Sequence, residues 1–193
     1  MDLDRNRIVM ALNSEVSANF VKDIADQLAI LSPQPFTFGA IAREVGETFP
    51  IWMIDTESLS NDTTSVSDAA KDISRTTSMV YSGGTPSFSV ESRVDGDKIL
   101  LTSLPIEPPP DQAVKLRSIF DKIDGDFGNK DGVVRQLEAP AYRFSALWLL
   151  LDDAEWIYPI ESGVSGLEFE TRYDWPTIRK SLLHASPVLG LVP

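Results

Sequence analysis

The stretch from Tyr142 to Ile160, YRFSALWLLLDDAEWIYPI, constrains the fold of this chain more than any other segment. It is the most apolar run in the sequence and holds two of the four Trp residues. Apolar side chains fall on both faces between residues 142 and 151, which predicts a strand in a sheet covered on both sides. A polar turn at residues 152–155 then leads into a second apolar run, so residues 142–160 are predicted to form a hairpin. A single buried helix is the alternative, because short apolar runs fit both structures.

The rest of the sequence predicts an α+β fold with a mostly antiparallel sheet. Asp95-Gly96 between two strand-like runs predicts a hairpin over residues 87–104. Alternating apolar and charged residues predict a strand over residues 167–173. Apolar residues at steps of three and four predict helices that pack on this sheet. These helices span residues 14–31, 37–49, 111–123 and 176–184, and a modest helix is predicted over residues 68–80.

The length and composition favour one domain over residues 1–193. Within it, residues 1–56 could form an N-terminal helical subdomain, followed by a polar, exposed loop at residues 57–67. The absence of Cys excludes disulfides, thiolate metal sites and Cys nucleophiles. No apolar run approaches the roughly 20 residues of a membrane helix. The N-terminus lacks a basic region followed by an apolar core, so we expect a cytoplasmic protein.

The formal net charge is −12, from 17 basic and 29 acidic residues, which disfavours binding to a nucleic-acid backbone. The charge is unevenly distributed, because seven acids and one base lie between Asp152 and Asp174. This asymmetry predicts either a solvated acidic face or a surface that docks a basic protein partner. The predicted partner-binding residues are Asp152, Asp153, Glu155, Glu161, Glu168 and Glu170.

The segment FDKIDGDFGNKDGVVRQLE, from Phe120 to Glu138, resembles a calcium-binding EF-hand. A predicted helix leads into two Asp residues that match the first two ligand positions of that family's loop. Gly128 and Arg135 stand at loop positions five and twelve, where the family has ligands, and the pattern recovers only with two inserted residues. A polar turn between a helix and a strand is the alternative. The resemblance implies a divalent-cation site formed by Asp124, Asp126, Asp131 and Glu138.

Three other sequence features give weaker indications of function. IAREVG at residues 41–46 resembles the first helix of a helix-turn-helix, but the next residues, ETFPIWMIDTE, contain Pro50 and no base for the major groove. The residues around Ser165 lack the second Gly of a nucleophile elbow, because Leu167 occupies that position. The only imidazole, His184, lies near the end of a predicted helix, where we expect a surface residue that interacts with the helix C-terminus.

These observations predict a non-catalytic protein-interaction domain, comparable in role to an immunity protein, adaptor or inhibitor, that binds a basic partner through its acidic face. A divalent-cation module at residues 120–138 is the first alternative. An enzyme that uses carboxylates in a cleft is the second, since acid–base chemistry requires two carboxyl groups in different environments. No cofactor is predicted.

Overall fold

A computed structural model of the chain describes residues 22–27, 43–60, 64–95, 98–103, 110–128 and 130–187. The strands are β1 (Arg43–Ile54), β2 (Ala70–Ser82), β3 (Thr85–Asp95), β4 (Lys98–Ser103), β5 (Gly132–Ala139), β6 (Phe144–Leu151) and β7 (Glu155–Ser162). The helices are α3 (Thr56–Ser60), α4 (Val66–Ala69), α5 (Pro110–Phe127), the 3-10 turn η1 (Pro140–Tyr142) and α6 (Trp175–His184). Residues 22–27 are also helical. No helix in the described ranges is long and apolar enough to cross a membrane.

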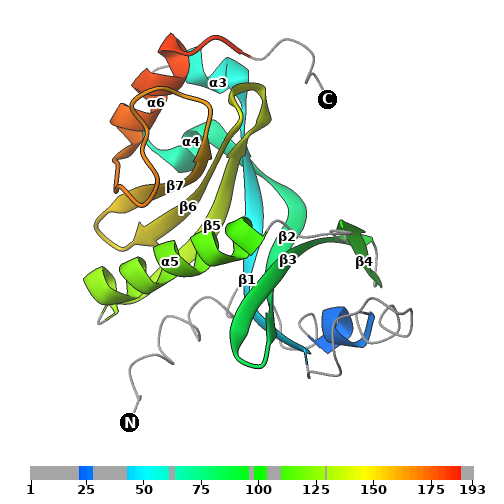
Figure 1. Cartoon of the computed structure of the whole chain (residues 1–193). Coiled ribbons are helices and arrows are strands. Elements are labelled where there is room, and N and C mark those ends of the chain that lie inside the picture. Colours follow the sequence, from blue (N-terminus) through cyan, green and yellow to red (C-terminus); the bar gives the residue numbers. More distant parts are fainter. Residues whose placement is uncertain are drawn as a thin grey trace.

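The seven strands form one sheet in the order β4-β3-β2-β1-β5-β6-β7 (Figure 1). Strands β1 to β4 form one antiparallel meander and β5 to β7 form another. The meanders meet where β1 runs parallel to β5, and α5 leads the chain from β4 back across the sheet to β5. The fold is therefore α+β with a mixed sheet.

Helix α5 covers one face of the sheet, as Figure 1 shows. Its apolar stripe packs against inward side chains of β1, β2, β5, β6 and β7. The helix is also held by a polar contact at its middle. Arg117 Nη1 lies 3.3 Å from Glu47 Oε1, and the Tyr81 hydroxyl donates to Glu47 Oε2 at 2.5 Å. Burial, together with the nearby Glu47 carboxylate, raises the pKa of Tyr81 to about 12, so this phenol stays protonated and remains a donor.

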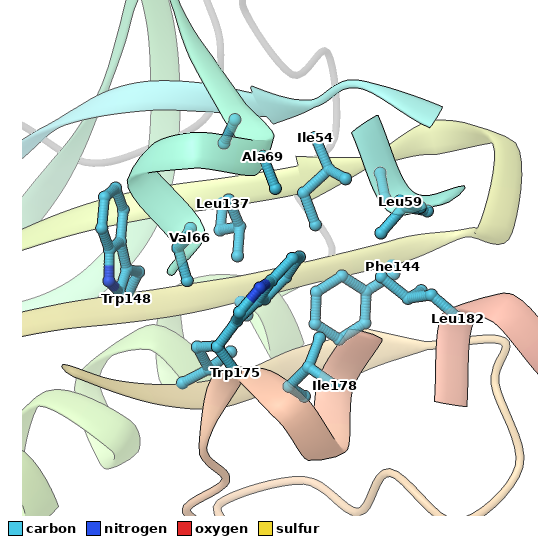
Figure 2. Packing of buried hydrophobic residues seen from close by; sticks show 14 of the residues in the cluster. Ile54, Leu59, Val66, Ala69, Leu137, Phe144, Trp148, Trp175, Ile178 and Leu182 are labelled. Carbon is cyan, nitrogen blue, oxygen red and sulfur yellow. The ribbon is translucent and has the colours of Figure 1, made fainter. Parts of the chain in front are cut away.

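The opposite face is covered by α3, α4 and α6, whose apolar residues close over β1, β5, β6 and β7 (Figure 2). Trp175 and Ile178 of α6 are buried against Trp148 of β6 and neighbouring side chains. The α6 N-terminus is fixed by the Asp174 side chain, which accepts a hydrogen bond from the Thr177 backbone N–H. This face therefore holds α6 firmly along the edge half of the sheet.

The helix predicted over residues 37–49 is wrong for its described part, because residues 43–54 form β1 near the middle of the sheet. A register shift between Val45 and Thr48 lies within this strand. Val45 packs with the cluster around Val80, whereas Phe49 packs under α5, so the two side chains are on opposite faces. The predicted helix would place Val45 and Phe49 on one face, whereas the bulge puts them on opposite faces of the sheet.

Three other predicted elements differ in the structure. Most of the predicted helix 68–80 belongs to β2, which spans Ala70–Ser82. Residues 167–173 form no strand beyond a single bridge between Tyr173 and Ile157. Glu170 has a φ of 60°, a left-handed conformation that interrupts an extended chain. Part of the predicted loop 57–67 is helical, and Leu59 within it is fully buried. Of the predicted helix 14–31, only residues 22–27 are described, and they are helical.

Candidate functional site: an acidic end of the sheet

The start of β5 and the end of β6 place two acidic residues side by side. Gly132 pairs with Leu151 across these strands, so Asp131 and Asp152 flank the same pair at one end of the sheet. The turn after β6 is closed by a hydrogen bond of 2.8 Å from Leu151 N to Ala154 O, which leaves Asp152 and Asp153 exposed at its tip. Two chain segments thus present carboxylates at this end.

The last turn of α5 brings two more acids to the same end. Gly128 N donates to Asp124 O at 2.8 Å, so the helical hydrogen bonding continues to the last residue of this turn. A Cβ at Gly128 would lie 2.5 Å from Asp124 O, and this close approach explains the glycine. Lys130 Nζ then lies 3.8 Å from Asp153 Oδ1, which sets the end of the helix beside the β6–β7 turn. Figure 1 shows this turn and α5 at the same side of the molecule.

We call this surface the acidic end. It consists of Asp124, Asp126, Asp131, Asp152 and Asp153. All but Asp124 are exposed, and Asp124 is half-buried. The Lys130 ion pair neutralises little of their charge, because both partners are largely in water and such pairs are weak.

The edge of the acidic end is built from aromatic side chains and one arginine. Arg172 stacks over Trp156 at 4.4 Å and lies 5.5 Å from the centre of the Phe127 ring. Behind them, burial raises the pKa of Tyr158 to about 12, and the charge of Asp126 adds to this shift. The stack joins β7, the segment before α6 and the end of α5, so these acids sit on a fixed frame.

Of the remaining predicted partner-binding residues, Glu155 and Glu170 are held by hydrogen bonds within the protein, and Glu161 lies at the other end of β7. Glu155 accepts hydrogen bonds from Trp148 Nε1 at 3.2 Å and from Val66 N at 3.0 Å, so it ties β7 to β6 and α4. Burial raises the pKa of this carboxyl. Glu170 accepts a hydrogen bond from the Ser118 hydroxyl. Glu161 and Glu168 are exposed, but Glu161 lies at the other end of β7, opposite Ser145.

The four predicted metal ligands are not gathered at one point. Asp124 and Asp126 lie on α5, which continues to Phe127 where an EF-hand would already form its loop. Asp131 precedes β5 and Glu138 lies near its far end, which separates them by about 20 Å at the usual rise of a strand. Among the residues that the structure describes, no group of three or more His, Cys, Asp or Glu is placed to hold a metal ion.

Glu138 instead belongs to a polar cluster in the middle of the sheet. Its Oε1 accepts a hydrogen bond of 2.7 Å from Gln136 Nε2, and Gln136 is buried. The pKa of Glu138 is raised above its usual value, mainly by burial. The Gln136 hydrogen bond and the nearby Arg75 oppose this shift but do not cancel it. This environment is structural support for the junction of β1 and β5.

Sequence reasoning missed an aromatic–cation stack on the α6 face of this junction. The guanidinium of Arg135 lies 4.5 Å from the ring centre of Trp52 and 4.9 Å from that of Trp148. The two rings meet edge to face at 5.6 Å. In the sequence, Arg135 was aligned only with position twelve of an EF-hand loop. Its aromatic partners come from β1 and β6. No local pattern could have linked them.

Comparisons with protein-family models, with curated proteins and with solved structures found no match to this chain.

Proposed function

We propose that this chain is a non-catalytic protein-binding domain that docks a basic partner on its acidic end. The observation that supports the proposal is the gathering of five carboxylates from three chain segments, of which Asp153 alone pairs with Lys130. The net charge of −12 has the same sign, so the long-range field and the local surface act together. The same charge disfavours a nucleic acid as the partner.

The physical role of such a surface is to steer and orient a partner. Exposed carboxylates on a fixed frame raise the association rate of a positively charged protein and disfavour acidic competitors. Each exposed charge contributes little affinity by itself, about 0.2–1 kcal/mol in water. We therefore expect the contacts that set the residence time to come from partner surface that reaches the half-buried Trp156 at the edge of the acidic end.

The test measures capture of basic proteins by the purified domain at two salt concentrations. We expect captured proteins with strongly basic surfaces, and we expect their binding to weaken several-fold between about 0.05 and 0.5 M salt, because screening shortens the range of surface charges. The double variant Asp152→Asn/Asp153→Asn should weaken binding of the captured partner by about 3- to 10-fold, mainly through the association rate.

A matched control removes the same charge elsewhere. Glu57 and Glu161 are exposed and lie away from the acidic end, so Glu57→Gln/Glu161→Gln removes the same two negative charges from the chain. The control should retain most of the affinity. Equal losses in the two double variants, or binding that does not respond to salt, would contradict the proposal.

A further inference from the structure

An open groove lies at the end of the sheet opposite the acidic end. It is formed by α6, by η1 with the residue that follows it, and by the segment after β7, and it encloses about 830 Å³. Volumes of this size are typical of sites for small organic ligands. The lining residues are Tyr142, Arg143, Gly163, Val164, Ser165, Thr177, Lys180, Ser181, His184, Ala185 and Ser186.

The charge of the groove has the opposite sign to that of the whole chain. Its lining includes Arg143, Lys180 and His184 but no Asp or Glu, although the chain has a net charge of −12. Arg143 and Lys180 are exposed, and within the described part of the chain neither forms an ion pair. Both side chains are therefore available to an anionic ligand.

The wall opposite α6 is held in one conformation. Arg143 has a φ of 48°, and its N–H donates to Pro140 O at 3.0 Å, so the chain turns sharply at the end of η1. Gly163 N donates to Arg143 O at 2.9 Å. A Cβ at Gly163 would lie 3.0 Å from Tyr142 O and 3.2 Å from Arg143 Cβ, which leaves little room for a larger residue. A left-handed Arg costs free energy, and such residues concentrate at functional sites.

The other wall is one stripe of α6. Thr177, Lys180, Ser181 and His184 follow the helical spacing that puts side chains on the same side of a helix. His184 Nδ1 lies 2.6 Å from Lys180 O, so Nδ1 carries the hydrogen and Nε2 is left for another partner. Cations at the end of a helix also suit its dipole, which accounts for Lys180 and His184 alone. Arg143 comes from a different element, and its position in the groove needs another explanation.

We propose that this groove binds a small phosphomonoester whose phosphate contacts Arg143 and Lys180. A phosphate dianion offers three strong acceptor oxygens, which suits a guanidinium, an ammonium and the hydroxyls of Ser165 and Thr177. The groove is larger than a phosphate group, and Tyr142 with other apolar lining residues provides a surface for an organic body. This inference is independent of the acidic end, which lies elsewhere on the molecule.

The test is a titration of the full chain with phenyl phosphate, followed by NMR of the imidazole signals. His184 is the only His in the chain, so these signals report on the groove alone. We expect them to shift with saturation below about 10 mM ligand, as for weak binding in the millimolar range. Inorganic phosphate should bind more weakly because it lacks the organic body, and benzoate should bind more weakly because it carries less charge.

Two variants and a control decide the role of the cations. Arg143→Asn keeps a residue that tolerates a left-handed backbone, and Lys180→Gln keeps a polar, unbranched stem while removing the charge. Each should weaken phenyl phosphate binding by at least about 10-fold, which corresponds to one lost charge-assisted contact. Lys122→Gln removes an exposed charge on α5, away from the groove, and should change the affinity less than about 2-fold.

Several results would overturn the inference. No shift of the His184 signals at about 10 mM phenyl phosphate would remove the site. Equal binding of benzoate would contradict the assignment of a phosphate group. Equal binding of inorganic phosphate would contradict the assignment of an organic body to the ligand. An affinity loss in Lys122→Gln as large as in Lys180→Gln would show a nonspecific charge effect. Circular dichroism of each variant checks that the fold is intact.

Discussion

Two adjacent leucines of α6 give a direct test of how this helix is packed. Leu182 is 0% exposed and lies in the cluster with Trp175 and Ile178 (Figure 2). Leu183, the next residue, is 45% exposed. Leu182→Ala therefore removes buried methyl and methylene groups and leaves a cavity, whereas Leu183→Ala shortens a side chain that is open to water and leaves no enclosed cavity.

The expected magnitudes differ clearly. Truncation of a fully buried Leu costs about 3 kcal/mol, from lost burial and from the cavity. In a domain of this length, that loss lowers the melting temperature by about 6–12 °C. Truncation of an exposed Leu changes the free energy of unfolding by less than about 0.5 kcal/mol, so Leu183→Ala should melt within about 2 °C of the wild type.

The assay is urea unfolding followed by Trp fluorescence, supported by calorimetry. Trp148 and Trp175 lie in the same buried cluster as Leu182, so their emission reports on the packing that the variant disturbs. The urea midpoint should fall for Leu182→Ala with an unchanged slope. Similar losses in the two variants would refute the packing of α6 through this face, and with it the position of one wall of the groove.

Two further substitutions test the sheet itself. Burial raises the pKa of Glu138 above 4.5, so its contribution to stability is complete below that pH and is lost as pH rises through the folded pKa. A glutamine side chain cannot ionise, so the Glu138→Gln variant does not lose stability in this way. Thermal unfolding should therefore show the stability of the variant rising relative to that of the wild type from about pH 4.5 to 8. A Cβ at Gly46 would lie 2.4 Å from Tyr81 Cε2, so Gly46→Ala should cost about 1–3 kcal/mol in urea unfolding.

Each of these substitutions has its own control. Glu57 is exposed, so Glu57→Gln should not reproduce the pH-dependent gain, and a parallel pH profile for the two variants would argue against the buried environment of Glu138. For Gly46→Ala, the cost should shrink when Tyr81 is also replaced by Ala, because the clash partner is gone. An undiminished cost would place the strain in the backbone.

The sequence pattern predicted the most apolar strand of the sheet but missed β1, β2 and β5. Residues 144–151 are apolar on both faces, and they form β6 between β5 and β7. Strand β2 carries Thr and Ser on its faces, and Thr76 finds its hydrogen-bond partner, Ser92 at 2.7 Å, only when β3 is in place. Most of β5 was considered only as part of the EF-hand-like segment 120–138 or of a polar turn, because nothing in its local sequence indicates the pairing with β1 and β6 that makes it a strand.

The acidic end was only partly predictable for the same reason. Charge counting found Asp152 and Asp153, and the EF-hand resemblance singled out Asp124, Asp126 and Asp131 for a different purpose. Only the pairing of β5 with β6 and the end of α5 bring the two sets together. Glu155 was predicted to bind the partner because it lies close to Asp152 and Asp153 in the sequence. In the structure it accepts hydrogen bonds from Trp148 and Val66, so its carboxylate faces the protein.

The groove and the acidic end are electrically separate although they share a strand. β6 begins at Phe144, next to the groove, and ends at Leu151, next to the acidic end. Its eight residues span about 25 Å. Counterions screen charge within about 8 Å at physiological ionic strength, so neither end alters the potential felt by a ligand at the other. An anion and a basic protein could therefore be held by one copy of the domain at the same time without competing.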